Sequence, residues 1–271
     1  MKYKVSVIMA VYNGEPYLKD SIESIIHQSF TDWQFVICDD GSSDNSFSIL
    51  CEYKEKYPEK IIVLQNSVNS KLPFSLNHCL KYASGEYIAR MDADDIAHPE
   101  RLKKQVEYLD YHPDISVVGT GMICFDNDIN NITGIRYPMA EPNSKIIGNG
   151  VPFYHATIMM RKEVYDKLGG YSLKPHVLRC EDVDLWIRFF GNGYYGANIQ
   201  DPLYYVREDF AAAQRRNFRN SINTSKTLFW GFRAYNYPIW QYALIAKPLI
   251  SALIPRKMKY FINSIRWRKN K

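Results

Sequence analysis

The chain has 271 residues, 46% of them hydrophobic, and a formal net charge of +5. This is enough for one large α/β domain, or for one domain and a tail. The five cysteines are an odd number without a C-x-x-C pair, which argues against a disulfide framework or a zinc site and indicates buried thiols of a reduced, cytoplasmic protein. Residues 1–4 lead directly into a strand-like run, so we expect no signal peptide.

The charge is distributed unevenly along the chain. Residues 211–271 hold 13 of the 34 Lys and Arg residues and no Asp or Glu, which leaves 21 basic and 29 acidic residues in 1–210. An acidic body with a basic tail predicts two roles, with the tail facing an anionic partner.

The first part of the chain alternates between strand and helix patterns. Strands are predicted at residues 5–11, 34–38, 61–64 and 87–91, and helices at residues 17–28, 44–53 and 74–83, the second with Asp44 as its N-cap. This β-α-β order with short links predicts a parallel, doubly wound α/β sheet.

The second part of the chain has a less regular pattern. A helix is predicted to begin at Pro99 and end at Tyr111, with strands at residues 115–122 and 156–161, a short helix at 164–168 and an amphipathic helix at 181–190. Residues 126–154 are rich in loop-forming residues.

Three polar loops, at residues 12–16, 39–44 and 92–95, each follow a predicted strand. The carboxyl ends of parallel strands share one edge of the sheet, and open α/β sheets bind ligands at that edge. Because neither G-x-G-x-x-G nor a P-loop occurs at the first turn, we do not expect a dinucleotide or P-loop site.

Asp92, Asp94 and Asp95 place three carboxylates within four residues, directly after a buried strand. On a continuing strand, Asp92 and Asp94 would point to the same side. Carboxylate oxygens suit Mg²⁺ or Mn²⁺, which could hold a substrate diphosphate. The alternative is a solvated acidic turn that caps the next helix.

A second acidic cluster, Glu181, Asp182 and Asp184, lies in the first turn of the predicted helix 181–190. Acidic residues are stabilised at a helix N-terminus without any role in catalysis. A carboxylate there can also face a cleft and act as a general base.

Four motifs together resemble the family-two inverting glycosyltransferases, over residues 3–210. They are VSVIMAVYN from Val5, DDGSSD from Asp39, DADD from Asp92 and EDVDLW from Glu181. The resemblance implies a GT-A fold with a doubly wound, mostly parallel sheet. It has a nucleotide-binding half (1–98) and an acceptor-binding half built around a mixed sheet (99–210), followed by a helical tail (211–271).

The resemblance also implies roles for individual residues. It assigns Asp182 as the catalytic base, with Glu181 as its neighbour or substitute, and Asp94 as the main metal ligand beside Asp92. Asp40 resembles the residue that accepts a hydrogen bond from the base, usually uracil. The full set of implied nucleotide contacts is Val11, Tyr12, Asn13, Glu15, Asp40, Lys71, Asp92 and Ala93. Lys71 stands where relatives often have an arginine, and it lacks the planar fork of that side chain.

The implied activity is the transfer of one sugar, with inversion, from a nucleotide sugar to a saccharide or a lipid-linked saccharide. The donor is expected to be a UDP-sugar, the cofactor Mn²⁺ or Mg²⁺, and the setting bacterial surface-polysaccharide synthesis. The Q-x-x-R-W pattern of processive relatives is absent, which favours a single addition. Two alternatives stay open: a nucleotidyltransferase on a related fold, and a non-catalytic module that binds nucleotide sugars or glycans.

Three features carry weaker hypotheses. Trp186 could stack on an acceptor sugar or pack in the core, and His155 could line the acceptor pocket or be structural. The tail interleaves basic residues with Trp, Phe and Ile between residues 256 and 269, which favours a peripheral position on anionic lipid at the inner face of the cytoplasmic membrane. Its alternative is a helix packed on the catalytic domain. No motif supports nucleic-acid binding.

Overall fold

A mixed sheet of nine strands forms the centre of the computed structural model, which describes residues 2–126, 128–208 and 218–253. The strand order is β3-β2-β1-β4-β8-β6-β9-β5, with β7 paired to β6 outside this path. The strands are β1 (Val5–Val11), β2 (Trp33–Asp39), β3 (Ile61–Gln65), β4 (Tyr87–Asp92), β5 (Ile96–Ala97), β6 (Ile115–Phe125), β7 (Ile132–Arg136), β8 (Met159–Arg161) and β9 (Tyr195–Arg207).

The first four strands in this order, β3 to β4, are parallel, and β8 is antiparallel to both β4 and β6. β1 and β2 are almost wholly apolar because helices cover both faces of the sheet. The predicted β-α-β half is therefore confirmed, and the sheet as a whole is mixed, as expected for the second half of the chain.

Two hydrophobic cores follow the two faces of the sheet. One face is covered by α1 (Glu15–Ile26), α2 (Ser46–Lys56) and α4 (Arg101–Tyr111), and the other by α3 (Leu72–Tyr82), α5 (Lys162–Leu168), α6 (Glu181–Gly191) and α8 (Phe218–Ala234). Short 3₁₀ helices are η1 (Ser144–Ile146), η2 (His155–Thr157), η3 (Pro175–Val177) and η4 (Ile239–Ala246). Each core contains residues from before and after position 98, so the predicted halves share their cores.

Three local predictions were wrong. The helix predicted from Pro99 begins at Arg101, because residues 96–97 form β5 and pair with β9. The N-cap of α2 is Asn45; the Asp44 carboxylate accepts the N–H groups of both Ser46 (3.0 Å) and Glu15 (3.1 Å).

The strand predicted at residues 156–161 contains only β8. Thr157 lies in η2, where its Oγ1 accepts the N–H of Thr120 (3.0 Å) and donates to the Tyr154 carbonyl (2.9 Å). The side chain thus provides the hydrogen bonds that a strand ladder would make. All five cysteines are free, as predicted, and four are buried; Cys51 is half-buried.

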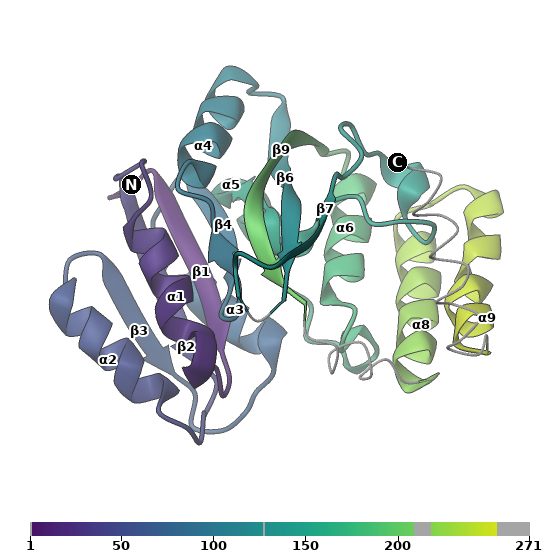
Figure 1. Ribbon diagram of the computed structural model, residues 1–271. Helices are drawn as coiled ribbons and strands as arrows, with labels where there is room; N and C mark the ends of the chain where they lie inside the picture. Colours follow the sequence, from purple (N-terminus) through teal and green to yellow (C-terminus); the bar gives the residue numbers. More distant parts are fainter. Residues whose placement is uncertain (1, 127, 209–217, 254–271) are drawn as a thin grey trace.

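The described part of the tail packs on the catalytic domain. Figure 1 shows α8 between α6 and α9 (Lys247–Leu253), at the side of the molecule away from β3. Leu228, Phe232 and Tyr237 enter the core, and the Tyr237 hydroxyl donates to the Ile187 carbonyl (3.1 Å). Residues 218–253 therefore pack on the domain.

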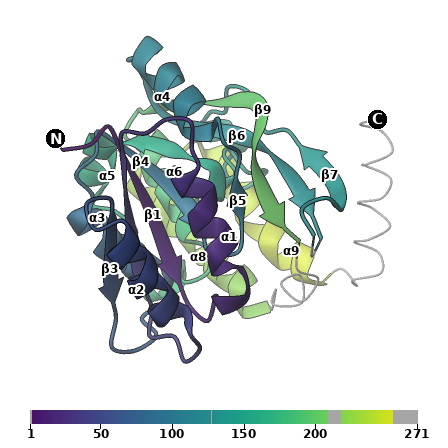
Figure 2. The same cartoon turned by 60° about the vertical axis from the view of Figure 1, so that its left-hand side comes forward.

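The membrane hypothesis concerns a stretch near the C-terminus. The basic and aromatic stretch at 256–269 lies outside the described residues and belongs to the thin grey trace in Figure 2. Within the described ranges, no helix has the length and apolar character needed to span a bilayer.

Gly231 brings α8 close to α6. A Cβ added there would lie 2.7 Å from Cγ2 of Ile187, a buried β-branched side chain that cannot move without leaving its rotamer. We expect Gly231→Ala to lower the free energy of unfolding by about 1–3 kcal/mol through overpacking, although alanine favours helices over glycine by about 1 kcal/mol. The measurement is urea unfolding followed by circular dichroism.

Arg233→Ala, on the exposed side of α8, is the matched control and should change stability by less than about 0.5 kcal/mol. A Gly231→Ala protein more stable than wild type would contradict the close packing of α8 on α6.

Candidate active site

The loops that follow β1 and β2 are hydrogen-bonded to each other at the carboxyl edge of the parallel strands. The N–H of Asn13 donates to Oγ of Ser42 (3.0 Å), and the N–H of Gly14 donates to Oγ of Ser46 (2.9 Å). A Cβ on Gly14 would lie 3.7 Å from Ala93, in the turn after β4. The predicted meeting of the three loops at one edge is confirmed.

Asp40 organises this edge from a buried position. Its Oδ1 accepts from Nδ2 of Asn66 (2.8 Å) and the N–H of Ser70 (2.8 Å), and its Oδ2 accepts from the N–H of Lys71 (2.9 Å). Lys71 has a φ of 77°, an unfavourable value for a lysine that these bonds hold in place. A carboxylate has about four acceptor positions, and these bonds occupy three of them.

The other predicted nucleotide contacts divide into two groups. Val11 is buried with its carbonyl accepting the Asp40 N–H (2.7 Å), and the Glu15 carboxylate accepts from Nδ2 (2.7 Å) and the N–H of Asn45. Both support the loops from within. The side chains of Tyr12, Asn13 and Lys71 are exposed at the same edge.

Asp92 forms a two-point ion pair with Arg90 on the same strand. Nη2 of Arg90 lies 2.7 Å from Oδ1 of Asp92, and Nη1 lies 3.2 Å from Oδ2. Arg90 is buried, with 5% of its surface exposed, so its charge needs a partner inside the protein. Asp92 is held in one orientation by this pair.

The prediction that Asp92 and Asp94 point to the same side assumed a continuing strand. β4 instead ends at Asp92, and residues 93–94 form a turn. The two carboxyl groups are nevertheless close enough to interact: partial desolvation and the charge of Asp92 raise the pKa of Asp94. Burial, with the charges of Asp92 and Asp94, raises the pKa of Asp95 well above its usual range, and Oδ1 of Asp95 accepts the N–H of Arg207 (2.9 Å).

This donor set fits a divalent cation that also binds a substrate. Within the described residues, no three carboxylate, histidine or cysteine side chains come together as a closed metal site. Mg²⁺ and Mn²⁺ need only one or two carboxylates when substrate phosphates and water complete the coordination. Asp94, with Asp92 beside it, offers that number, and a cation there would relieve their repulsion.

Glu181 and Asp182 form the first turn of α6. Burial raises the pKa of both carboxyl groups, while the positive charge of Arg90 lowers them. Oδ1 of Asp182 accepts the N–H of Val183 (2.8 Å), and Oε2 of Glu181 is buried without a partner among the described residues. A desolvated carboxylate with a free oxygen is suited to accept a proton.

Trp186 and His155 lie behind this turn in the core. Trp186, 1% exposed, packs against Phe153 with a ring-centroid distance of 4.6 Å, and so it offers no open face on which a sugar could stack. Nε2 of His155 lies 3.1 Å from the hydroxyl of Tyr171, and burial and Arg90 lower the pKa of His155 well below its usual range. Trp186 is therefore a core residue. His155 is half-buried and contacts both Tyr171 and Trp186, and its place in an acceptor pocket stays a prediction.

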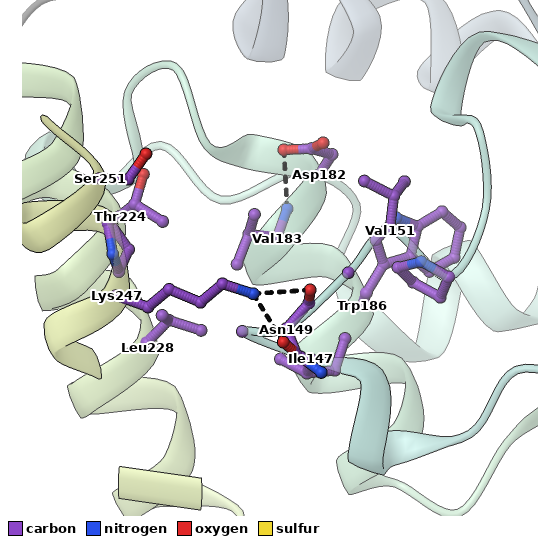
Figure 3. A pocket seen from close by; sticks show the side chains of 14 residues that line it. Ile147, Asn149, Val151, Asp182, Val183, Trp186, Thr224, Leu228, Lys247 and Ser251 are labelled. Carbon is purple, nitrogen blue, oxygen red and sulfur yellow. Dashed lines mark hydrogen bonds between the residues drawn. The ribbon is translucent and has the colours of Figure 1, made fainter. Parts of the chain in front are cut away.

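A cavity of about 410 Å³ opens beside Asp182 (Figure 3). One wall consists of residues 147–152 and α6, including Asp182, Val183 and the edge of Trp186. The opposite wall is formed by the tail: Thr224 and Leu228 from α8, and Lys247, Pro248 and Ser251 from α9. This volume lies within the range of small-molecule sites.

The sequence analysis missed Arg90, Arg207 and Lys247. A charged residue inside an apolar strand was the signal for Arg90, since a buried charge requires a partner. Arg207 donates from Nε to the Asp94 carbonyl (3.1 Å), and Lys247 donates to Asn149. No local pattern marks these two, because both act across contacts distant in sequence.

Comparisons with known proteins agree with this geometry. The family model described as "Glycosyl transferase family 2" matches residues 6–169. The chain is 46% identical over 252 residues to the protein named "Putative glycosyltransferase EpsE" of Bacillus subtilis (strain 168), covering 93% of this chain and 90% of that one. It is 29% identical over 228 residues to "Amylovoran biosynthesis glycosyltransferase AmsE" of Erwinia amylovora, covering 83% and 84%.

Two solved structures share the fold. S. aureus TarS in complex with UDP-GlcNAc has a TM-score of 0.69 at 22% identity, over 92% of this chain and 71% of that one. The mannosyltransferase PcManGT of Pyrobaculum calidifontis, in complex with GDP-Man and Mn²⁺, has a TM-score of 0.64 at 18% identity, over 100% and 81%. The fold is that of the GT-A glycosyltransferases, and the chain belongs to glycosyl transferase family 2.

Proposed function

We propose that this protein is an inverting, metal-assisted glycosyltransferase that moves one sugar from a UDP-sugar to a saccharide acceptor in polysaccharide synthesis. The observation that carries the proposal is the placement of two separate carboxylate clusters around one buried cation. Arg90 pairs with Asp92 at the carboxyl edge of the sheet, and its charge also acts on Asp182 at the cavity. The setting is supported by AmsE, whose name states amylovoran biosynthesis.

The donor is expected at the edge formed by the three loops. The exposed side chains of Tyr12, Asn13 and Lys71 would face the nucleotide, and the remaining acceptor position of Asp40 would receive the N–H of uracil. TarS, which shares the fold, was solved with UDP-GlcNAc, and this supports a uridine nucleotide.

Asp94 and Asp92 would hold Mn²⁺ or Mg²⁺, which stabilises the negative charge of the leaving diphosphate. Asp182 receives the proton of the acceptor hydroxyl. The hydroxyl oxygen forms a bond to the anomeric carbon from the face opposite the diphosphate, the bond between that carbon and the diphosphate oxygen breaks, and its electron pair leaves with the nucleoside diphosphate.

Arg90 would assist both metal binding by Asp92 and proton transfer to Asp182. It orients Asp92 through two hydrogen bonds, and its charge keeps Asp182 more easily ionised than burial alone would. A base must be unprotonated to work, so this offset matters at neutral pH. The nucleotidyltransferase alternative lacks support, since the first loop, residues 12–16, contains no basic residue for a triphosphate.

We expect Asp94→Ala to weaken the Mn²⁺-dependent part of UDP binding by at least about tenfold, because the main metal ligand is lost. The measurement is calorimetric titration of UDP, GDP and CMP with and without Mn²⁺. Asp114→Ala, an exposed carboxylate before β6, is the matched control and should bind UDP as wild type does. If the folded protein bound none of these nucleotides, the non-catalytic glycan-binding alternative would replace the transferase.

We expect Asp182→Asn to reduce the rate of sugar transfer by about 10²–10⁴, the usual contribution of general-base catalysis, while UDP binding stays within about twofold. Transfer is assayed as UDP release from UDP-sugars in the presence of candidate acceptors. An Asp182→Asn enzyme with the wild-type rate would assign the base elsewhere, and Glu181→Gln is then the next variant.

The same variant should be more stable than wild type at pH 7.5. The folded-state pKa of Asp182 is raised above its unfolded value of about 3.9, so ionisation of this carboxyl destabilises the fold as pH rises through that interval. Asp182→Asn removes the penalty at pH 7.5 and should have little effect near pH 3.5, where the carboxyl is protonated in both states. Thermal unfolding at the two pH values measures this.

Asp184→Asn is the matched control two residues along α6. Its carboxylate lies 2.7 Å from Nε of Arg188, so the substitution should lower stability at pH 7.5 by about 2 kcal/mol. Equal destabilisation by both variants would show that burial does not disfavour the charged form of Asp182.

A further inference from the structure

The acidic loop after β4 is held by β9, a strand from the second half of the chain. β9 pairs with β5, which directly follows this loop, and the Leu203 carbonyl accepts the N–H of His98 (3.1 Å). The match to the family model ends at residue 169, so β9 lies beyond it. The loop that carries the acidic motif is therefore fixed by a part of the chain that the family model does not cover.

Tyr204 of β9 joins the two ends of the loop. Its side chain is fully buried, and its hydroxyl accepts the N–H of Asp92 (3.0 Å). The same hydroxyl is hydrogen-bonded to the Asp95 carboxyl, and a hydroxyl can accept one hydrogen bond while it donates another. The guanidinium of Arg101 lies over the Tyr204 ring, with its Cζ 4.8 Å from the ring centroid. The Tyr204 ring is therefore held in one position, and its hydroxyl ties Asp92 to Asp95.

Arg207, at the end of β9, holds the turn itself. Its main-chain N–H donates to Oδ1 of Asp95 (2.9 Å), and its Nε donates to the Asp94 carbonyl (3.1 Å). The guanidinium also lies over two aromatic rings, with Cζ 4.2 Å from the ring centroid of Tyr17 in α1 and 4.6 Å from that of Phe125 in β6. A planar guanidinium that stacks on aromatic rings has little freedom left to lose. Arg207 therefore holds the Asp94 backbone from a fixed position.

The three carboxylates of the loop have different surroundings. Asp92 is paired with Arg90. Asp95 is only 4% exposed, and its carboxyl group is bonded to β9. Asp94 is exposed, and its bond to β9 uses the main-chain carbonyl, which leaves the carboxylate outside these contacts. A divalent cation that also binds substrate phosphates and water needs a carboxylate that it can reach from solvent, and this condition fits Asp94 and not Asp95.

We propose that Asp95, Tyr204 and Arg207 are positioning residues that fix the turn from which Asp94 reaches the metal ion. Asp95 is then not a metal ligand, although it belongs to the same acidic motif. Its carboxyl group instead serves as the acceptor that anchors the loop to β9. The inference rests on the proposed function, since the metal site at Asp94 is part of that function. It adds that the second half of the chain determines how well the first half binds the cation.

The positioning effect of Arg207 has the opposite sign to the effect of its charge. A guanidinium close to Asp94 repels a divalent cation, so removal of the charge alone would strengthen Mn²⁺ binding. Removal of the bond from Nε to the Asp94 carbonyl would instead free the turn and weaken Mn²⁺ binding. The direction of the change in an Arg207 variant therefore distinguishes the two effects.

The test measures the Mn²⁺ enhancement of UDP binding on the full chain, which is the UDP Kd without Mn²⁺ divided by the UDP Kd with saturating Mn²⁺. Both values come from calorimetric titration. Asp95→Ala should lower this ratio about tenfold, the usual effect of losing a group that orients a metal ligand. Asp95→Asn keeps an oxygen that can accept the Arg207 N–H, so its ratio should stay within about threefold of wild type. Asp94→Asn should abolish the enhancement.

Two variants of β9 test the other partners of the loop. Tyr204→Phe keeps the buried ring and removes only the hydroxyl, and it should lower the ratio about threefold, the effect of one lost hydrogen bond. Arg207→Ala should also lower the ratio. Tyr205→Phe, one residue along the strand, is the matched control and should behave as wild type. Thermal unfolding verifies that each variant is folded, and UDP binding without Mn²⁺ should stay within about twofold, because the nucleotide loops are unchanged.

Each other outcome overturns the inference in a defined way. If Asp95→Asn abolished the Mn²⁺ enhancement as Asp94→Asn does, Asp95 would be a metal ligand. A higher ratio in Arg207→Ala would show that its charge outweighs its hydrogen bond. In both cases, Mn²⁺-enhanced UDP binding by the wild type leaves the proposed transferase standing. A folded wild-type protein whose UDP binding does not respond to Mn²⁺ instead contradicts the metal-assisted function itself.

Discussion

The buried guanidinium of Arg90 is the constraint on which the site depends. It lies on β4, between the parallel strand β1 and the antiparallel strand β8, with 5% of its surface exposed. A charge so far from water is tolerated only with a partner, and its two-point pair with Asp92 supplies one. The first carboxylate of the acidic loop is therefore oriented by the interior of the protein before any ligand arrives.

The backbone around Arg90 is fixed by a second buried arginine. Nη2 of Arg101 donates to the Arg90 carbonyl (2.7 Å) and also lies within hydrogen-bonding distance of the carbonyls of Ala156 (3.3 Å) and Ile158 (3.4 Å). One side chain from α4 thus ties the end of the parallel half to the segment that leads into β8. At this point the sheet changes from the parallel pairing of β4 with β1 to the antiparallel pairing of β4 with β8.

How far the sequence predicts this arrangement depends on the range of each interaction. The strands that precede the loops could be predicted to within a residue or two, because burial on both faces leaves an unbroken apolar run. The acidic residues of the loop and of α6 could also be identified, since three carboxylates in four residues is a local pattern. β8 could be predicted as part of a longer strand, but the start of this strand could not, because Thr157 uses its hydroxyl in place of the ladder and bonds Thr120, far along the chain.

The packing of the tail also depends on contacts that are distant in sequence. Its missing acids and its aromatic residues favoured an anionic surface as the partner, and composition cannot distinguish a helix that faces lipid from one that faces protein. The close approach of Gly231 to Ile187 and the hydrogen bond from the Tyr237 hydroxyl to the Ile187 carbonyl show that α8 faces protein. Both contacts depend on a residue of α6. Some apolar side chains of α9, such as Leu253, stay exposed after the tail has packed on the domain.

The packing of the tail also affects the environment of Asp182, the proposed base. A carboxylate such as Asp182 gains proton affinity from burial, and burial at a site open to substrate requires walls on more than one side. The α6 turn provides one wall, and α8 with α9 provides the other. Without the tail, Asp182 would be more exposed to water, and the pKa of its carboxyl would fall towards the ordinary value. On the proposed function, the C-terminal helices and Asp182 therefore form one functional unit, although α8 begins 36 residues after Asp182.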